Sequence, residues 1–119
     1  GQKRWNLVSM LSIAAGLVEA QILRRGELLR FDGTRNDDFL QKMCDREARC
    51  YGAIESRIDL FTREVDLAQI QVGVCCGYAD FRFPQEDWRS GRPKLAGWYD
   101  ERFSRRRSMQ ATVHKETPQ

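Results

Sequence analysis

The hydrophobic pattern of residues 2–30 predicts one long helix with two apolar sides. The segment has no proline, and its glycines, Gly16 and Gly26, weaken a helix without ending it. Its apolar residues form two lines at three-to-four spacing, Trp5, Val8, Leu11, Ala15, Val18 and Ile22 in one and Leu7, Met10, Ala14, Leu17 and Leu28 in the other. A surface helix needs only one such line. We therefore expect the second side to be covered by another domain, a subunit or both.

Residues 36–61 predict a second helix that packs against the first. Asp32 and Gly33 favour a turn before it, and Thr34 is able to cap its first turn. Apolar residues then recur at helical spacing, namely Phe39, Met43, Ala48, Tyr51, Ile54, Ile58 and Phe61. Charged residues lie between them, namely Lys42, Asp45, Arg46, Glu47, Arg49, Glu55 and Arg57. They are either a binding patch or a solvated helix face, and the solvated face is the plainer interpretation.

The third predicted helix begins with a capping signature and is apolar on nearly every side. Asp66 is placed as the N-cap, and Gln69 follows it at the position where each side chain can satisfy the other's backbone amide. An apolar run from 70 to 79 comes next, interrupted by Gln71. Alternation within this run would also suit a strand, but its length and the capping signature favour a helix ending near Phe81 or Phe83. Such a helix belongs at the centre of a bundle.

Proline and glycine divide the rest of the chain. Phe83-Pro84 ends the third helix, and residues 85–91 form a loop that holds Trp88. Pro93 suits the first turn of a fourth helix, expected over 93–106, with a further short turn over 108–113 and a polar tail after it. The fold class is all-α, a bundle of four to five helices, and residues 1–119 form one domain.

Composition excludes several classes of protein. Hydrophobic residues make up 41% and charged residues 31% of the chain, which is the balance of a globular domain. A net charge of +3 gives no reason to expect a nucleic-acid partner. The longest apolar stretch, residues 7–23, is interrupted by polar side chains, and no secretory signal is visible, so we expect no membrane partner and a cytoplasmic location. The start at Gly1 suggests a fragment.

No residue cluster makes a self-contained active site. Cys44, Cys50, Cys75 and Cys76 form no CxxC pair and the only histidine is His114, so we expect no metal site and four reduced thiols. Catalytic residues are therefore assigned as none. Arginines 105–107 are either a phosphate patch or cations at a helix C-terminus. Four aromatic residues either line an apolar pocket or pack in the core, namely Tyr78, Trp88, Trp98 and Tyr99.

The order of these parts resembles the C-terminal helical domain of the glutathione transferase family, in its bacterial-type branch. The matching segments are the capped helix at Asp66, GYADFRFP after it, DWRSGRP as the link, KLAGWYDERF as the next helix and SMQAT as the close. The first helix, with RW near its start and ILRRGELLR at its end, also resembles that family's long first C-terminal helix. The resemblance covers nearly the whole chain.

The resemblance implies roles for particular residues. Asp66 would be the N-cap and Gln69 its partner, where family members usually have Ser or Thr followed by Asp. Ala15 stands where an acidic residue is common. Ser9, Ser12 and Gly16, in the first half of the first helix, would touch the pocket for the electrophile, although helix packing explains them equally well. The two departures leave the fold intact and weaken the case for ordinary catalysis.

The family's chemistry requires a second domain. A thioredoxin-like N-terminal domain binds glutathione, the co-substrate, and the helical domain supplies most of the electrophile pocket. This chain has only the helical part, so we expect it to be inactive alone, to need the missing thioredoxin-like domain and to form a homodimer. The alternative is a non-catalytic interaction or dimerisation module of the same fold. The sequence does not identify the electrophile.

Overall fold

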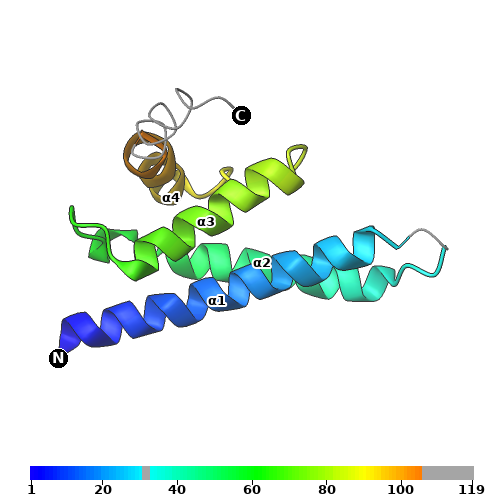
Figure 1. Cartoon of the computed structure of the whole chain (residues 1–119), viewed down its shortest axis with the longest axis horizontal. Helices are drawn as coiled ribbons and strands as arrows, with labels where there is room; N and C mark the ends of the chain where they lie inside the picture. Colours follow the sequence, from blue (N-terminus) through cyan, green and yellow to red (C-terminus); the bar gives the residue numbers. More distant parts are fainter. Residues whose placement is uncertain (31–32, 106–119) are drawn as a thin grey trace, which may run out of the picture.

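The protein is an all-α bundle, as the hydrophobic pattern predicted (Figure 1). The computed structural model describes residues 1–30 and 33–105. No strand occurs within these ranges. The elements in chain order are α1 Gln2–Leu28, α2 Asp37–Glu55, the 3₁₀ turn η1 Ile58–Leu60, α3 Leu67–Arg82, α4 Pro93–Gly97 and the π-helical turn η2 Trp98–Phe103. The short turn and tail expected after residue 107 lie outside the described residues.

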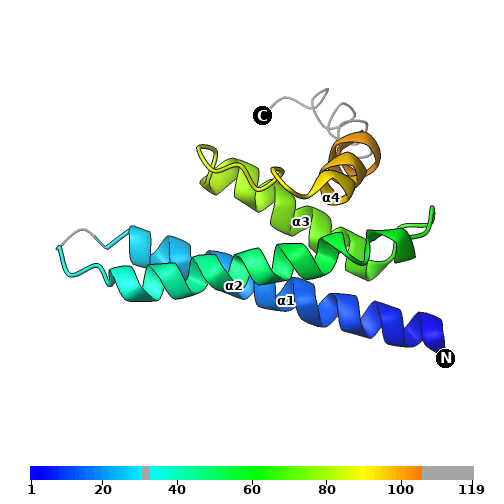
Figure 2. The ribbon, with the colours of Figure 1, turned by 180° about the vertical axis from the view of Figure 1, so that it is seen from behind.

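The helices form a flat, two-layered molecule of 46 × 45 × 23 Å. Helices α1 and α2 are an antiparallel pair, and α3 packs against α1 (Figures 1 and 2). The face in Figure 1 shows α1 and α3, whereas α2 and α4 lie in front when the molecule is turned over in Figure 2. Helices α1 and α3 thus lie in front on one broad side of the molecule, with α2 behind them (Figure 1).

Helix α2 is shorter than its pattern predicted, and its cap is a different residue. Asn36, not Thr34, is the N-cap, and its side chain accepts a hydrogen bond from the Phe39 amide at 3.0 Å. The helix ends at Glu55 rather than Phe61, where Ser56 Oγ donates to the Ala53 carbonyl at 2.9 Å. A serine that bonds a preceding carbonyl offers the backbone an alternative to further helix. The chain then turns so that Phe61 meets the ring of Trp98 at 5.0 Å.

Helix α3 begins at Asp66 as its N-cap, whose carboxylate accepts from the Gln69 amide at 2.9 Å. The reciprocal half of the capping box is not formed. Instead, the Gln69 side-chain amide is buried and donates to the Thr62 and Glu64 carbonyls at 3.1 and 3.0 Å. An aspartate in the same place has no N–H to donate. The Gln69 side chain therefore stabilises the loop before α3 and does not complete the capping box.

The fourth helix is capped by a residue far away in the sequence. Arg92, at the N-cap position, makes no side-chain capping bond. The Glu55 carboxylate, at the end of α2, accepts from the Lys94 and Leu95 amides at 3.0 and 2.7 Å. After Gly97 the helix widens into η2, whose i→i+5 bonding brings residues five apart onto one side. The rings of Trp98 and Phe103 consequently lie in contact, with their centroids 5.3 Å apart and their planes tilted by 30°.

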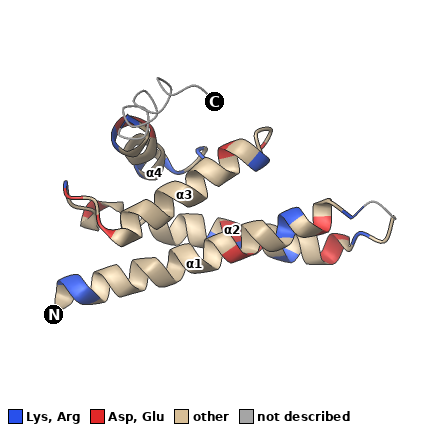
Figure 3. Ribbon diagram, in the orientation of Figure 1, with Lys and Arg blue, Asp and Glu red and all other residues tan. Residues whose placement is uncertain are grey.

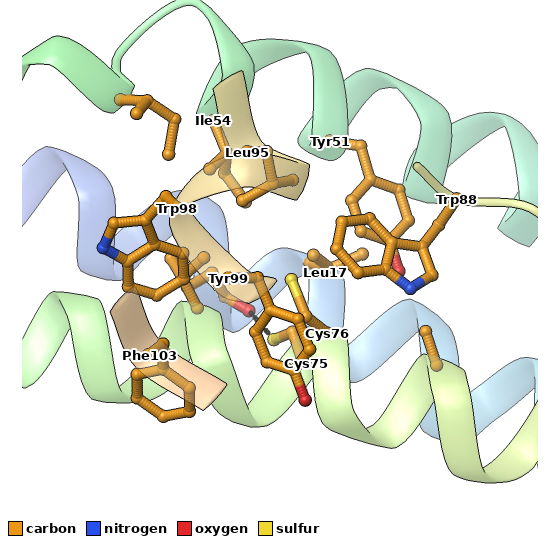
Figure 4. Packing of buried hydrophobic residues seen from close by; sticks show 14 of the residues in the cluster. Leu17, Tyr51, Ile54, Cys75, Cys76, Trp88, Leu95, Trp98, Tyr99 and Phe103 are labelled. Carbon is orange, nitrogen blue, oxygen red and sulfur yellow. Dashed lines mark hydrogen bonds between the residues drawn. The ribbon is translucent and has the colours of Figure 1, made fainter. Parts of the chain in front are cut away.

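The core lies between α1, α2 and α3, where α4 packs against α2 and η2 packs against α3 (Figure 4). Cys75 and Cys76 are fully buried at the centre of the core, among Leu17, Tyr51 and Tyr99. The Cys75 thiol donates a hydrogen bond to the Ala14 carbonyl of α1 at 3.6 Å. Three of the four aromatics considered in the sequence are core residues, namely Trp88, Trp98 and Tyr99. Core packing is therefore the correct interpretation for these three.

Helix α3 approaches η2 closely because residue 73 is glycine. A Cβ built on Gly73 would overlap the ring of Phe103, which is itself buried. We expect Gly73→Ala to lower the free energy of unfolding, since overpacking costs about 1–3 kcal/mol and outweighs the roughly 1 kcal/mol that alanine adds to a helix. Chemical denaturation measures the difference.

Gly52→Ala is the matched control for this substitution. Gly52 lies in α2 with open space at its Cβ position, so only the helix-propensity gain applies and the protein should become more stable. Equal stabilisation by both alanines would show that α3 and η2 are not in close contact.

Candidate functional site

Helix α1 has one buried and one uncovered side, as its two apolar lines predicted. Met10, Ala14 and Leu17 are buried, and Leu7 is half-buried against the same core. The other line contains the exposed side chains Trp5 and Ile22, which retain 66% and 56% of their accessible surface. The bundle therefore buries the line that begins at Leu7 and leaves exposed residues on the line that begins at Trp5.

Helix α3 extends this exposed apolar surface. Leu67, Ile70, Val74 and Phe81 follow each other at helical spacing and are all exposed, Phe81 at 69%. Helix α1 carries no charged residue between positions 5 and 18, and α3 carries none between 67 and 79 (Figure 3). We call the apolar surface of α1 and α3 the uncovered face; its large members are Trp5, Val8, Ile22, Leu23, Leu67, Ile70, Val74 and Phe81.

Exposed apolar residues that gather on two neighbouring helices are typical of an interaction site, whereas single exposed apolar residues are ordinary. Because α2 and α4 lie on the opposite side of the molecule, neither is able to cover it (Figures 1 and 2). The described part of the chain therefore leaves these apolar side chains of α1 and α3 exposed.

Beneath the uncovered face, the buried line of α1 continues into polar residues. Gln21 is fully buried and donates to the Tyr51 hydroxyl and the Cys75 carbonyl at 3.2 and 3.0 Å. Its Oε1 has no hydrogen-bond partner in the described part of the chain. This amide links α1, α2 and α3 through one side chain.

One turn further along α1, Arg24 is the centre of a buried ion network. Its guanidinium binds Glu47 of α2 through Nε and Nη2 at 2.6 and 2.9 Å, and Glu86 of the loop after α3 through Nη1 and Nη2 at 2.7 and 2.9 Å. It also lies 3.7 Å from the centroid of the Phe83 ring. Arg24 and Glu47 are each 5% exposed. The charged face predicted for α2 is therefore not wholly solvated.

The network changes the ionisation of its members. Desolvation raises the pKa of Glu47 above its ordinary value, and the hydrogen bonds and charge of Arg24 oppose this without cancelling it. Desolvation alone would lower the pKa of Arg24, but its bonds to Glu86 and Glu47 outweigh that and raise it. Sequence reasoning missed this network, although Arg24 continues the spacing of the buried line from Leu17 through Gln21.

The cysteines are poorly suited to nucleophilic chemistry. All four are free, and burial raises the pKa of Cys75 to about 12 and that of Cys76 well above its ordinary value. Burial also raises the pKa values of the half-buried Cys44 and Cys50. The thiolate is the reactive form, so these thiols are largely unreactive at neutral pH. Within residues 1–30 and 33–105, no group of three acidic, cysteine or histidine side chains could hold a metal ion.

The three small residues proposed for a pocket follow one line on α1, at intervals of three and four. Ser12 is exposed and Ser9 is half-buried. A Cβ on Gly16 would lie 3.6 Å from Cys50 Sγ and 3.7 Å from Arg46 Nη2, so this glycine borders α2. None of the three lines any of the four best-formed pockets in the described part of the chain.

Pockets occur elsewhere in the described chain, and two of them lie near groups discussed above. One, of about 150 Å³, lies beside the Arg24 network between Cys44 and Trp88. The other, of about 640 Å³, is a groove between the start of α1 and the connection from η1 to α3. We call it the N-terminal groove; its apolar walls include Leu7, Met10, Leu60, Phe61 and Ala68, and its charged residues are Lys3, Arg4, Arg63, Glu64 and Asp66.

Helix α1 is long and apolar enough to cross a membrane when judged by length and composition alone. The core helix of a water-soluble bundle satisfies the same criteria, and α1 packs against both α2 and α3. The criterion therefore adds no positive case for a membrane.

Comparison with known proteins agrees with the fold. The family defined as the glutathione S-transferase C-terminal domain matches residues 38–101. Two crystal structures of a glutathione transferase family member from Pseudomonas fluorescens Pf-5 superpose with a TM-score of 0.84 at 36% identity, one with bound glutathione and one with bound S-(propanoic acid)-glutathione. Each match covers 94% of this chain, but only 55% and 58% of the two crystallised chains. No curated protein matches the chain.

The chain belongs to the glutathione S-transferase family and has the fold of its C-terminal helical domain. It spans a little over half the length of the relatives whose structures it resembles. The family is a two-domain fold, and the helical half is the part described here.

We expect the Arg24 network to dominate the stability of the middle of the bundle. Arg24→Met leaves Glu47 buried without its cation and should cost about 3–5 kcal/mol of unfolding free energy, while the double variant Arg24→Met/Glu47→Met should recover most of it. Arg25→Met, at the neighbouring half-buried position, should have little effect. Denaturant titrations measure all three.

The loss in Arg24→Met should depend on pH. Without the guanidinium, the folded-state pKa of Glu47 rises further above its unfolded value, so the protonated form favours folding. Stability is then retained at acidic pH and falls as pH rises through the folded-state pKa. A deficit independent of pH from 4 to 8 would contradict the presence of an unpaired buried carboxylate.

Proposed function

We propose that this chain is the electrophile-site and dimerisation half of a glutathione transferase-like enzyme. The observation that carries the proposal is the uncovered face, because it is a broad apolar surface in a chain that spans little more than half of its structural relatives. A thioredoxin-like domain placed against α1 and α3 would remove this surface from water and bring glutathione to it. The same first helix would take part in a homodimer.

The described residues include no activated nucleophile, and this suggests how the two halves of the complete protein would share the reaction. The buried thiols have raised pKa values and there is no catalytic histidine cluster, so this half supplies no activated nucleophile of its own. In the complete protein, glutathione would provide the thiolate, since a thiol with a lowered pKa is the reactive species. The helical half would hold an apolar electrophile and exclude water from it.

Ser9, Ser12 and Gly16 remain our candidates for the electrophile side of the site. Their small side chains leave space along α1, and Ser12 is exposed next to the uncovered face. Any pocket that they help to form would be closed by the other domain, since they line none of the four best-formed pockets of the described chain.

The second candidate function is a non-catalytic interaction module of the same fold. It is favoured by Gln69, which holds the loop before α3 in place of the carboxylate usual in the family, and by Ala15 on the exposed side of α1. Both changes leave the bundle folded while removing acidic groups. Fold alone does not decide between the two functions.

We expect the chain alone not to conjugate glutathione to a chromogenic aryl halide. A chimera that joins the N-terminal half of the Pseudomonas relative to this chain should do so, because the uncovered face then has its partner. A chimera that folds and binds glutathione, yet conjugates none of a panel of apolar electrophiles, would favour the interaction module. Turnover by the isolated chain would overturn the proposal.

We also expect the chain to self-associate through the uncovered face. Ile22→Glu/Val74→Glu places two charges on that face and should shift the protein to monomer, as measured by light scattering across a concentration series. Leu29→Glu/Leu60→Glu alters two other exposed leucines with the same change in charge and should leave association intact. A wild-type chain that stays monomeric at high concentration would contradict this expectation.

A further inference from the structure

Arg24 binds two carboxylates that differ greatly in burial. Glu47 is 5% exposed, whereas the side chain of Glu86 retains 55% of its accessible surface. Arg24 Nη2 is shared between them, since it donates to both carboxylates at 2.9 Å. If Glu86 moved away, Glu47 would still neutralise the guanidinium, and solvent would hydrate Glu86. Release of Glu47 would instead leave a buried charge without a partner, which is far more costly. The ion pair with Glu86 is therefore the one that opens more easily.

Glu86 belongs to a short exposed segment between two buried rings. Residues 84–87 are all exposed, whereas Phe83 and Trp88 on either side are 6% and 5% exposed. Trp88 is also fixed by the bond from its Nε1 to Asp80 at 2.8 Å. Within the described chain, Glu86 is the member of 84–87 whose side chain bonds to another helix. The segment is thus held at both ends by buried rings and in the middle by one ion pair.

The segment forms part of the wall of a pocket of about 150 Å³, which we call the Arg24 pocket. Glu86 and Asp87 lie on this wall, and Cys44 and Tyr51 of α2 line another part of the pocket. A pocket of this volume has room for water, so the N–H groups that Glu86 would release could be hydrated. Cys44 is half-buried, and it is the one cysteine of the described chain among the lining residues.

We propose that residues 84–87 are a lid on the Arg24 pocket, that the Glu86–Arg24 ion pair is its latch, and that the open lid exposes the Cys44 thiol. Glu47 neutralises Arg24 in both states, and only Glu86 exchanges the guanidinium for water. This inference does not rest on the proposed transferase function, because the pocket includes none of the large residues of the uncovered face.

The closed lid accounts for part of the low reactivity of Cys44. Desolvation is the largest cause that raises the pKa of this thiol, and the charge of Arg24 opposes it. The carboxylates of Glu47, Glu86 and Asp45 raise it further. An open lid would hydrate the thiol and remove one carboxylate from its surroundings, so more thiolate would form at a given pH. Loss of the Glu86 charge would accelerate alkylation even under a closed lid, and the test has to separate the two effects.

The test compares two neutral alkylating agents that share one reactive group. Iodoacetamide is small, whereas iodoacetanilide carries an added phenyl ring, for which a pocket of about 150 Å³ has little room. Both react with the thiolate, whose sulfur displaces iodide, so a change in the thiol pKa alters the two rates by the same factor. Peptide mass spectrometry of the full chain gives a rate for each cysteine. The ratio of the iodoacetanilide rate to the iodoacetamide rate at Cys44 therefore reports the lid.

Glu86→Ala should raise this ratio at Cys44 about fivefold. An ion pair with one exposed partner is worth up to about 1 kcal/mol, which corresponds to that change in the open population. Because the Glu86 side chain is 55% exposed, the bundle should stay folded and Cys75 should stay as protected as in the wild-type chain. An unchanged ratio, with or without a common rise of both rates, would overturn the proposal. Equal acceleration of all four cysteines would also overturn it, since that would show opening of the whole bundle.

Glu19→Ala is the matched control for the latch. The Glu19 side chain is 61% exposed and pairs with Arg46 of α2 at 3.4 Å, and neither residue lines the Arg24 pocket. The substitution makes the same change in net charge and should leave the ratio at Cys44 unchanged. A rise as large as that in Glu86→Ala would show that loss of any exposed carboxylate loosens the segment, and the latch would then be wrongly assigned.

Discussion

The structure depends on one constraint: α1 is apolar on two sides, and a bundle of this size buries only one of them. The line from Met10 to Leu17 is committed to the core, so α2 and α3 must pack around it. The opposite line then faces outward beside the exposed residues of α3. A broad water-facing apolar surface is costly unless a partner removes it. Membership of a two-domain family gives this surface a natural explanation.

Polar contacts, rather than apolar ones, fix how the helices are placed relative to one another. Gln21 and Arg24 lie on the buried side of α1 and reach α2, α3 and the loop after α3. Buried polar groups require defined partners, whereas apolar residues tolerate several arrangements. On the other layer, Arg89 binds Asp80 and Asp100 through paired nitrogens and so joins α3 to η2. These polar contacts favour one arrangement of the helices, whereas the apolar core residues alone would tolerate several.

The sequence allowed prediction of the helices and of the two-sided α1, because periodicity and caps are local signals. It did not allow prediction of where α2 ends, since the turn that brings Phe61 to Trp98 depends on a residue far along the chain. The ion pair of Glu47 with Arg24 was likewise not predicted. A charged residue on a helix with mixed polarity is expected to be solvated unless a buried partner is known. The spacing of Gln69 predicted that it completes the cap of α3. Its side-chain amide instead donates to the Thr62 and Glu64 carbonyls of the preceding loop. The N-terminal groove required three segments to be placed together.

The distant cap of α4 has a consequence for how the molecule assembles. Helix α4 spans only Pro93–Gly97 and relies on Glu55 for two of its first amides. The helix continues without a break into η2, so α4 and η2 together span Pro93–Phe103. Its first turn is therefore closed by a residue of α2 rather than by a neighbour in sequence, and Glu55→Ala would leave two amides of α4 without an acceptor. One carboxylate thus joins the end of α2 to the segment that carries Leu95, Trp98 and Phe103 into the core.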